Sequence, residues 1–163
     1  MKTLLILRHA KTQPDAPNGD HVRQLTNRGH RDAESIAAYI QRQLGTPDAV
    51  VTSDARRAMQ TAEIVAHGVG FAESLTVEPR IYAASSETLL DVVRALPDDA
   101  DSVILVGHNP GFEELAEVLS GGGEDVRLPT SAFAHLEFDA TNWAGVQPGS
   151  GRLREIATRH TIS

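Results

Sequence analysis

Short apolar runs alternate with segments of helical periodicity along most of this chain, and this alternation constrains the fold more than any other feature. The runs are apolar on both faces, as is typical of strands buried on both sides of a sheet. Strands are therefore expected at residues 3–7, 49–52, 75–77 and 102–106. Apolar residues recur every three or four positions in between, which predicts helices at residues 26–44, 55–66, 85–96 and 110–120. This order favours an α/β fold with a largely parallel sheet.

The C-terminal part changes character. Two strands are expected at residues 131–138 and 152–157, joined by a loop rich in glycine and proline. Neither a repeat of fixed period nor a long linker interrupts the chain, so residues 1–163 are expected to form one domain. We predict a three-layer α/β/α sandwich whose central sheet is mostly parallel and carries an antiparallel edge strand.

Residues with short polar side chains mark the expected starts of three helices, because such side chains accept hydrogen bonds from free backbone N–H groups. The expected N-caps are Thr26 for the first helix, Ser53 or Asp54 for the second, and Ser85 or Ser86 for the third. Pro110 is expected at the first position of the fourth helix, where its missing N–H has no cost.

The charge balance restricts the partners. The chain has 15 Lys and Arg residues against 22 Asp and Glu residues, a formal net charge of −7, which argues against binding to nucleic acid or anionic membranes. It has no cysteine, so disulfides and thiol catalysis are excluded. No segment approaches the roughly 20 apolar residues of a membrane span, and no signal peptide is recognisable, so we expect a cytoplasmic protein. We also expect a monomer, because nothing in the sequence indicates an additional interface.

Unusual residues follow three of the expected strands. Arg8 and His9 follow the first strand, Arg56 and Arg57 come shortly after the second, and His108 follows the strand at 102–106. Ligands of open α/β sheets bind outside the carboxyl ends of the strands, so these side chains are expected to meet at one edge. Each residue has a structural explanation by itself, but two arginines at a helix start are disfavoured by the helix dipole. Their convergence indicates a site.

Two histidines with two arginines suit phosphoryl transfer. Guanidinium groups bind phosphate oxygens through paired hydrogen bonds, and a helix N-terminus adds further donors. A neutral imidazole can attack phosphorus while a second histidine offsets the developing charge. The chemistry therefore predicts a phosphorylated histidine as intermediate.

Three segments resemble the signature blocks of the histidine phosphatase (phosphoglycerate mutase-like) superfamily: Leu5-Ile6-Leu7-Arg8-His9-Ala10-Lys11-Thr12, Thr52-Ser53-Asp54-Ala55-Arg56-Arg57-Ala58-Met59-Gln60-Thr61-Ala62 and Val106-Gly107-His108-Asn109-Pro110. The resemblance implies the phosphoglycerate mutase-like fold, with His9 as nucleophile and Arg8, Arg57 and His108 as phosphate-binding residues. It selects Arg57 over Arg56, because the family's arginine directly precedes Ala-x-x-Thr. It implies no metal and no cofactor.

Residues 22–29 and 129–132 resemble the SixA-type phosphohistidine phosphatases within this superfamily, and the short chain leaves no room for a cap domain. An uncapped site would suit a phosphorylated side chain of another protein. On this resemblance Arg23 is expected as a further phosphate or substrate contact, with Thr12 and Asn109 shaping the surrounding loops.

Many superfamily members also carry a carboxylic acid that protonates the leaving group. The candidates here are Glu78, Glu87 and Asp91, and Glu87 is the first choice, although it would equally complement a helix dipole. A protonated imidazole leaves readily, so a site without this acid is chemically reasonable.

Three other functions stay open at this point. The first is a phosphomonoesterase of the same fold that acts on small molecules. The second is a phosphate-binding module without activity, although binding alone would not need both histidines. The third is a metal-dependent hydrolase, but the seven histidines show no close metal-binding spacing.

Overall fold

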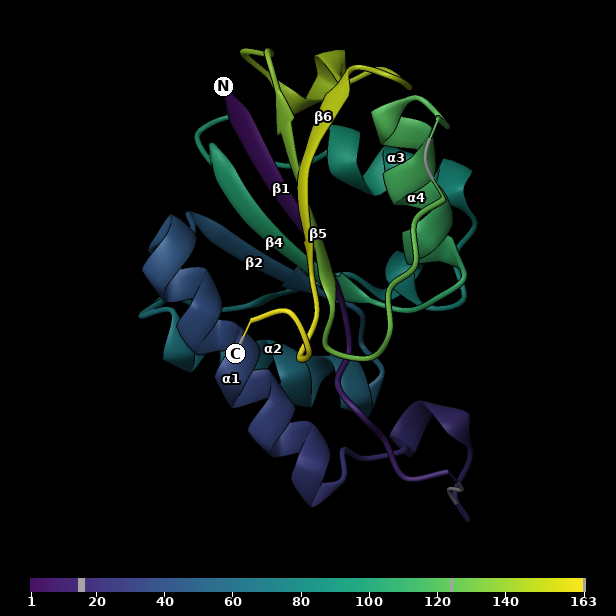
Figure 1. The fold of residues 1–163 in the computed structure, drawn as a ribbon. Coiled ribbons are helices and arrows are strands. Elements are labelled where there is room, and N and C mark those ends of the chain that lie inside the picture. Colours follow the sequence, from purple (N-terminus) through teal and green to yellow (C-terminus); the bar gives the residue numbers. More distant parts are fainter. Residues whose placement is uncertain (15–16, 124, 163) are drawn as a thin grey trace.

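A single mixed sheet forms the centre of the molecule (Figure 1). The computed structural model describes residues 1–14, 17–123 and 125–162, and within them the sheet has six strands in the order β3-β2-β4-β1-β5-β6. The strands are β1 (Lys2–Arg8), β2 (Ala49–Thr52), β3 (Thr76–Val77), β4 (Ser102–Gly107), β5 (Phe133–Phe138) and β6 (Gly151–Ala157). Every expected strand is therefore present, with small shifts at the ends.

The first four strands of the chain run parallel, and the last two add a hairpin. β1 pairs with β4, β4 with β2 and β2 with β3 in parallel, whereas β5 is antiparallel to both β1 and β6. The antiparallel strand β5 thus lies one position inside the edge, and β6 forms the edge itself. β5 begins later than expected because Ser131 has a positive φ of 60°, which breaks the extended backbone.

Helices cover both faces of the sheet (Figure 1). The helices are α1 (Asn27–Leu44), α2 (Arg56–Gly68), α3 (Ser86–Arg94) and α4 (Gly111–Ser120). Alternate residues of β1 point to opposite faces: Leu4 and Ile6 pack in the core with α3 and α4, whereas Leu5 and Leu7 pack in the core with α1 and α2. These two apolar cores confirm the predicted α/β/α sandwich.

The helix starts show where local signals hold. Thr26 caps α1 by accepting a hydrogen bond from the Gly29 N–H, and Ser85 caps α3 in the same way from the Thr88 N–H. The predicted cap of α2 is wrong, because α2 starts after Ala55 without a side-chain cap. Pro110 is the N-cap of α4 rather than its first helical residue.

Three short 3-10 helices complete the described structure: η1 (Asp20–Val22), η2 (Pro79–Ile81) and η3 (Trp143–Gly145). The described segment between β3 and α3 contains η2 and adds no cap domain over the end of the sheet. None of the described helices is both long enough and apolar enough to cross a bilayer.

Candidate active site

The parallel strands bring three chain segments to one edge of the sheet. Arg8 is paired with Gly107 in the β1–β4 register, and the backbone continues this pairing beyond the strands. The His9 N–H donates to the Gly107 carbonyl, and the Ser53 N–H donates to the Val106 carbonyl, each at 3.0 Å. The His9 and His108 rings consequently lie with their centroids 5.3 Å apart.

Gly107 allows β4 to leave the sheet at this point. A Cβ at this position would lie 2.5 Å from the Phe112 ring and 2.6 Å from the Ile81 side chain, which is closer than real Cβ contacts. Because both neighbours are buried in the core, they have little room to shift. The glycine therefore sets the position of the following residue, His108.

His9 is held by its own backbone. Its Nδ1 lies 2.8 Å from the Ala10 carbonyl oxygen, so Nδ1 carries the proton and Nε2 keeps a free lone pair. The side chain is buried, and this burial lowers the pKa of His9 from 6.5 to about 4, with the positive charges of Arg57, Arg8 and Arg23 adding to the effect. His9 is therefore a neutral imidazole at pH 7.

His108 is held by a side chain instead. Its Nε2 lies 2.8 Å from the Ser53 hydroxyl oxygen, which also accepts a hydrogen bond from the Ala55 N–H at 3.2 Å. Burial lowers the pKa of His108 from 6.5 to about 3, with further contributions from His9 and Arg57. Among the described residues the Ser53 hydroxyl has no other acceptor for its proton, so we assign this proton to the hydrogen bond with Nε2. This leaves the proton of the neutral ring on Nδ1.

The structure separates the two neighbouring arginines at the start of α2. Arg57 is 5% exposed, whereas Arg56 is exposed to solvent. Both Nη groups of Arg57 donate to Asp20 in η1: Nη1 to the main-chain carbonyl at 2.7 Å and Nη2 to Oδ2 at 3.0 Å. Arg57 is thus the arginine turned into the molecule.

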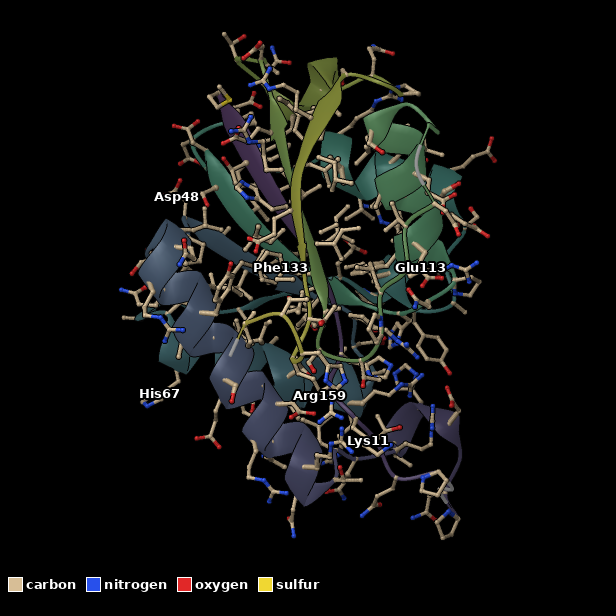
Figure 2. All side chains as sticks on the ribbon, in the orientation of Figure 1. Lys11, Asp48, His67, Glu113, Phe133 and Arg159 are labelled. Atoms are coloured by element: carbon tan, nitrogen blue, oxygen red, sulfur yellow. The ribbon has the colours of Figure 1, made fainter. Side chains whose placement is uncertain are left out.

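Arg8 and Asn109 share one anchor. The Arg8 Nη1 and the Asn109 Nδ2 both donate to the Leu128 carbonyl, at 3.1 and 2.8 Å. The Leu128 N–H in turn donates to Glu113 Oε2 at 2.7 Å, and Figure 2 shows Glu113 on α4. The Leu128 carbonyl therefore orients two of the predicted site residues, Arg8 and Asn109.

Three nitrogen atoms around the histidine pair are buried without a partner. Within the described part of the chain, no hydrogen-bond acceptor meets Arg8 Nε, Arg57 Nε or His108 Nδ1. Buried donors without an acceptor are costly, and they are uncommon in folded proteins. Oxygens of a bound anion are acceptors of the kind that such donors lack.

A cavity of about 520 Å³ adjoins Arg57 and His108. Arg57, His108 and Asn109 line it together with residues that were not predicted as site residues, namely Asp20, Tyr82, Ala83, Ala84, Ser85, Pro110, Gly111 and Glu114. The Tyr82 ring stands edge-on to the His108 ring with the centroids 5.5 Å apart. Tyr82 is a single aromatic residue in a loop, and no local pattern marks it.

Of the remaining predicted site residues, Arg23 and Thr12 lie near the histidines and arginines, whereas Glu87 does not. Arg23 donates from Nη1 to the Thr12 hydroxyl at 3.1 Å and from Nε to Asp20 Oδ1 at 3.0 Å, so Arg23 and Thr12 both belong to this neighbourhood. Glu87 is exposed in the first turn of α3 and is absent from the described lining of the cavity. The structure does not bring Glu87 into the cluster.

Comparison with known proteins agrees with this geometry. The sequence model of the histidine phosphatase superfamily (branch 1) matches residues 4–83, a range that includes Arg8, His9 and Arg57. A solved structure of the protein histidine phosphatase SixA complexed with tungstate superimposes with a TM-score of 0.86 at 24% identity, covering 99% of both chains. The chain belongs to the histidine phosphatase superfamily. The structural match also extends the phosphoglycerate mutase-like fold beyond residue 83.

Two curated relatives are similar over nearly the whole chain. An uncharacterized protein of Mycobacterium tuberculosis (strain ATCC 25618 / H37Rv) is 33% identical over 156 residues, covering 90% of this chain and 96% of the relative. The phosphohistidine phosphatase SixA of Escherichia coli (strain K12) is 28% identical over 147 residues, covering 86% of this chain and 91% of the relative. Membership of this family and these similarities support a phosphatase activity.

Proposed function

We propose that this protein is a phosphohistidine phosphatase in which His9 is the nucleophile. The observation that carries the proposal is a buried neutral imidazole with a free Nε2, next to three buried donors that meet no acceptor among the described residues. The three donor atoms belong to Arg8, Arg57 and His108. A phosphoryl group bound to these donors would present its phosphorus to His9.

In the first step, the His9 Nε2 lone pair forms a bond to phosphorus as the phosphorus–nitrogen bond of the substrate breaks. The substrate imidazole, protonated on its other nitrogen, leaves as a neutral ring. The phosphorylated His9 ring becomes positively charged, and the Nδ1–H hydrogen bond to the Ala10 carbonyl stabilises that charge.

The surrounding donors stabilise the transferring group. Arg8 and Arg57 hold its equatorial oxygens, and the Nδ1–H of His108 donates to a further oxygen. The arginines thus supply positive charge at the place where a metal ion supplies it in other phosphatases.

In the second step, water attacks phosphorus and the phosphorus–Nε2 bond breaks. Inorganic phosphate leaves, one proton of the water is released, and His9 returns to the neutral state. In this proposal, residues 1–163 form one domain that carries out both steps.

The substrate assignment depends on the leaving group and on whether the cavity holds an acid that can protonate it. Two carboxylates, Asp20 and Glu114, line the cavity. Asp20 is unsuited to donate a proton, because its hydrogen bond from Tyr82 and its pairing with Arg57 lower the pKa of Asp20 to about 2. Glu114 is exposed, and no hydrogen bond among the described residues directs its carboxylate towards His9. A protonated imidazole leaves without an acid, whereas an alkoxide does not. The similarity to a phosphohistidine phosphatase of Escherichia coli supports the same choice.

The test compares two kinds of substrate at equal concentration. A histidine-phosphorylated phosphotransfer domain and a panel of sugar and nucleotide phosphate esters are each incubated with the protein, and phosphate release is followed. We expect the phosphohistidine protein to have the higher kcat/KM. A higher kcat/KM for any of the small esters would show that the protein is a phosphomonoesterase instead.

A further inference from the structure

Asp20 makes an unusual set of contacts for a surface carboxylate. Its Oδ2 accepts from Arg57 Nη2 at 3.0 Å and from the Tyr82 hydroxyl at 2.5 Å, while its Oδ1 accepts from Arg23 Nε at 3.0 Å. Its main-chain carbonyl accepts from Arg57 Nη1 at 2.7 Å. One residue of η1 therefore connects two arginines and a tyrosine that come from three separate segments.

The contacts with Arg57 use one edge of the guanidinium. A guanidinium has five N–H groups in a plane, and Asp20 engages one on Nη1 and one on Nη2, at the end of the fork. The side edge is made by Nε and the second Nη2 hydrogen. Arg57 Nε is buried and has no acceptor among the described residues, although the side chain is almost fully enclosed. Two parallel donors on that edge match two oxygens of a phosphoryl group.

Tyr82 and Arg23 hold the carboxylate in turn. The Tyr82 ring lies against Arg57, with the guanidinium carbon 5.9 Å from the ring centroid, and edge-on against His21, with the centroids 4.5 Å apart. Arg23 is fixed at its other end by the Thr12 hydroxyl and the Gln13 carbonyl. The Asp20 side chain is 51% exposed, so these contacts determine its position.

We propose that Asp20 is a positioning residue, which clamps the end edge of the Arg57 guanidinium so that the side edge faces the phosphoryl group. This inference rests on the proposed function, because it assigns the unoccupied edge of Arg57 to the phosphate of the substrate. Asp20 acts through Arg57 and does not touch the reacting atoms.

The direction in which phosphate affinity changes when Asp20 is removed separates this positioning role from simple competition between Asp20 and phosphate for Arg57. A carboxylate next to Arg57 offsets positive charge, so its removal by electrostatics alone would tighten phosphate binding. Loss of the clamp has the opposite effect, because the free guanidinium must be ordered when phosphate binds. We expect the second effect to be the larger one.

The experiment measures the Kd of inorganic phosphate by titration calorimetry for the full chain and its variants. Asp20→Ala is expected to weaken binding about tenfold, the scale of a hydrogen bond to a charged group. Asp20→Asn should recover part of the loss, because its amide oxygen still accepts from Arg57. Asp139→Asn is the matched control, since Asp139 is an exposed aspartate that accepts from Arg152 at 3.0 Å in another exposed ion pair. Circular dichroism melting shows that each variant is folded.

A double-mutant cycle with Arg57→Ala completes the test. Once Arg57 is removed, Asp20→Ala should change phosphate affinity by less than about twofold, because the clamp has nothing left to hold. Tighter binding by Asp20→Ala, or a full tenfold loss in the Arg57→Ala background, would overturn the inference. Unchanged affinity in Arg57→Ala alone would overturn this inference and the proposed phosphate site together. The expected affinities without any phosphohistidine hydrolysis would refute only the proposed function.

Discussion

The ends of β1 and β4 each present a buried histidine, but they hold it by different means. His9 is fixed by the Ala10 carbonyl of its own backbone, whereas His108 is fixed by the side chain of Ser53, 55 residues away. The first contact leaves Nε2 without a proton, and the second leaves the proton on Nδ1. The comparison teaches that two neutral imidazoles can have opposite roles, one as nucleophile and one as donor.

Replacing the nucleophile should have the largest effect. His9→Ala is expected to abolish turnover and leave phosphate affinity nearly unchanged, because the three donor nitrogens remain in place. Phosphate release and calorimetric phosphate binding are the two measurements. His30→Ala, which removes an exposed histidine of α1, is the control. Normal turnover in His9→Ala would refute the assignment of the nucleophile.

Removing a charged donor should have the next largest effect. Arg57→Ala is expected to lower kcat/KM by about 10²–10³, the scale of losing one oriented donor to a developing charge. Arg56→Ala is the matched control from the same turn of α2, because Arg56 is exposed. Equal losses in the two variants would mean that burial does not distinguish the functional arginine.

Removing the hydroxyl that holds His108 should have a smaller effect. Ser53→Ala is expected to lower kcat about tenfold, because the imidazole loses the hydrogen bond that selects its tautomer. Ser120→Ala serves as the control, since the Ser120 hydroxyl donates to the Ala116 and Glu117 carbonyls of its own helix. If Ser53→Ala lowered thermal stability and left kcat unchanged, Ser53 would have a purely structural role.

Titration of the two rings should show the smallest functional effect and the clearest pH signature. The pKa values of about 4 for His9 and about 3 for His108 lie below the ordinary 6.5, so both rings should stay neutral as the pH falls through 6.5. The unfolded chain binds more protons than the folded one in this window, so the free energy of unfolding should decrease as the pH falls from 6.5 towards 4. NMR titration, with signals assigned through His9→Ala and His108→Ala, measures the pKa values directly. Midpoints near 6.5 would contradict the burial argument.

The sequence predicted the parts of the molecule that depend on local order. The buried runs of β1, β2 and β4 predicted the parallel strands, and parallel strands necessarily bring Arg8, His9 and His108 to the same edge. Thr26 and Ser85, the latter one of two candidates with Ser86, are caps that sequence can predict, because a cap hydroxyl bonds to the N–H only three residues further on. Short-range rules are sufficient for such features.

Long-range contacts account for what the sequence could not predict. Neither predicted cap, Ser53 or Asp54, caps α2, and the Ser53 hydroxyl is engaged by His108 and by the Ala55 N–H before the helix begins. Asp20 meets Arg57 across 37 residues and Tyr82 across 62. No spacing rule connects residues at such separations, so the clamp on Arg57 became visible only in the fold.

The most direct test of the central claim is to trap the enzyme during turnover. The protein is mixed with a histidine-phosphorylated phosphotransfer domain, quenched within the first turnover in alkali, where phosphohistidine survives, and analysed by peptide mass spectrometry. The account predicts an acid-labile phosphoryl group on His9 in the chain without substitutions, and no such group in His9→Ala. Turnover without phosphate on His9, or with phosphate on His108, would contradict it.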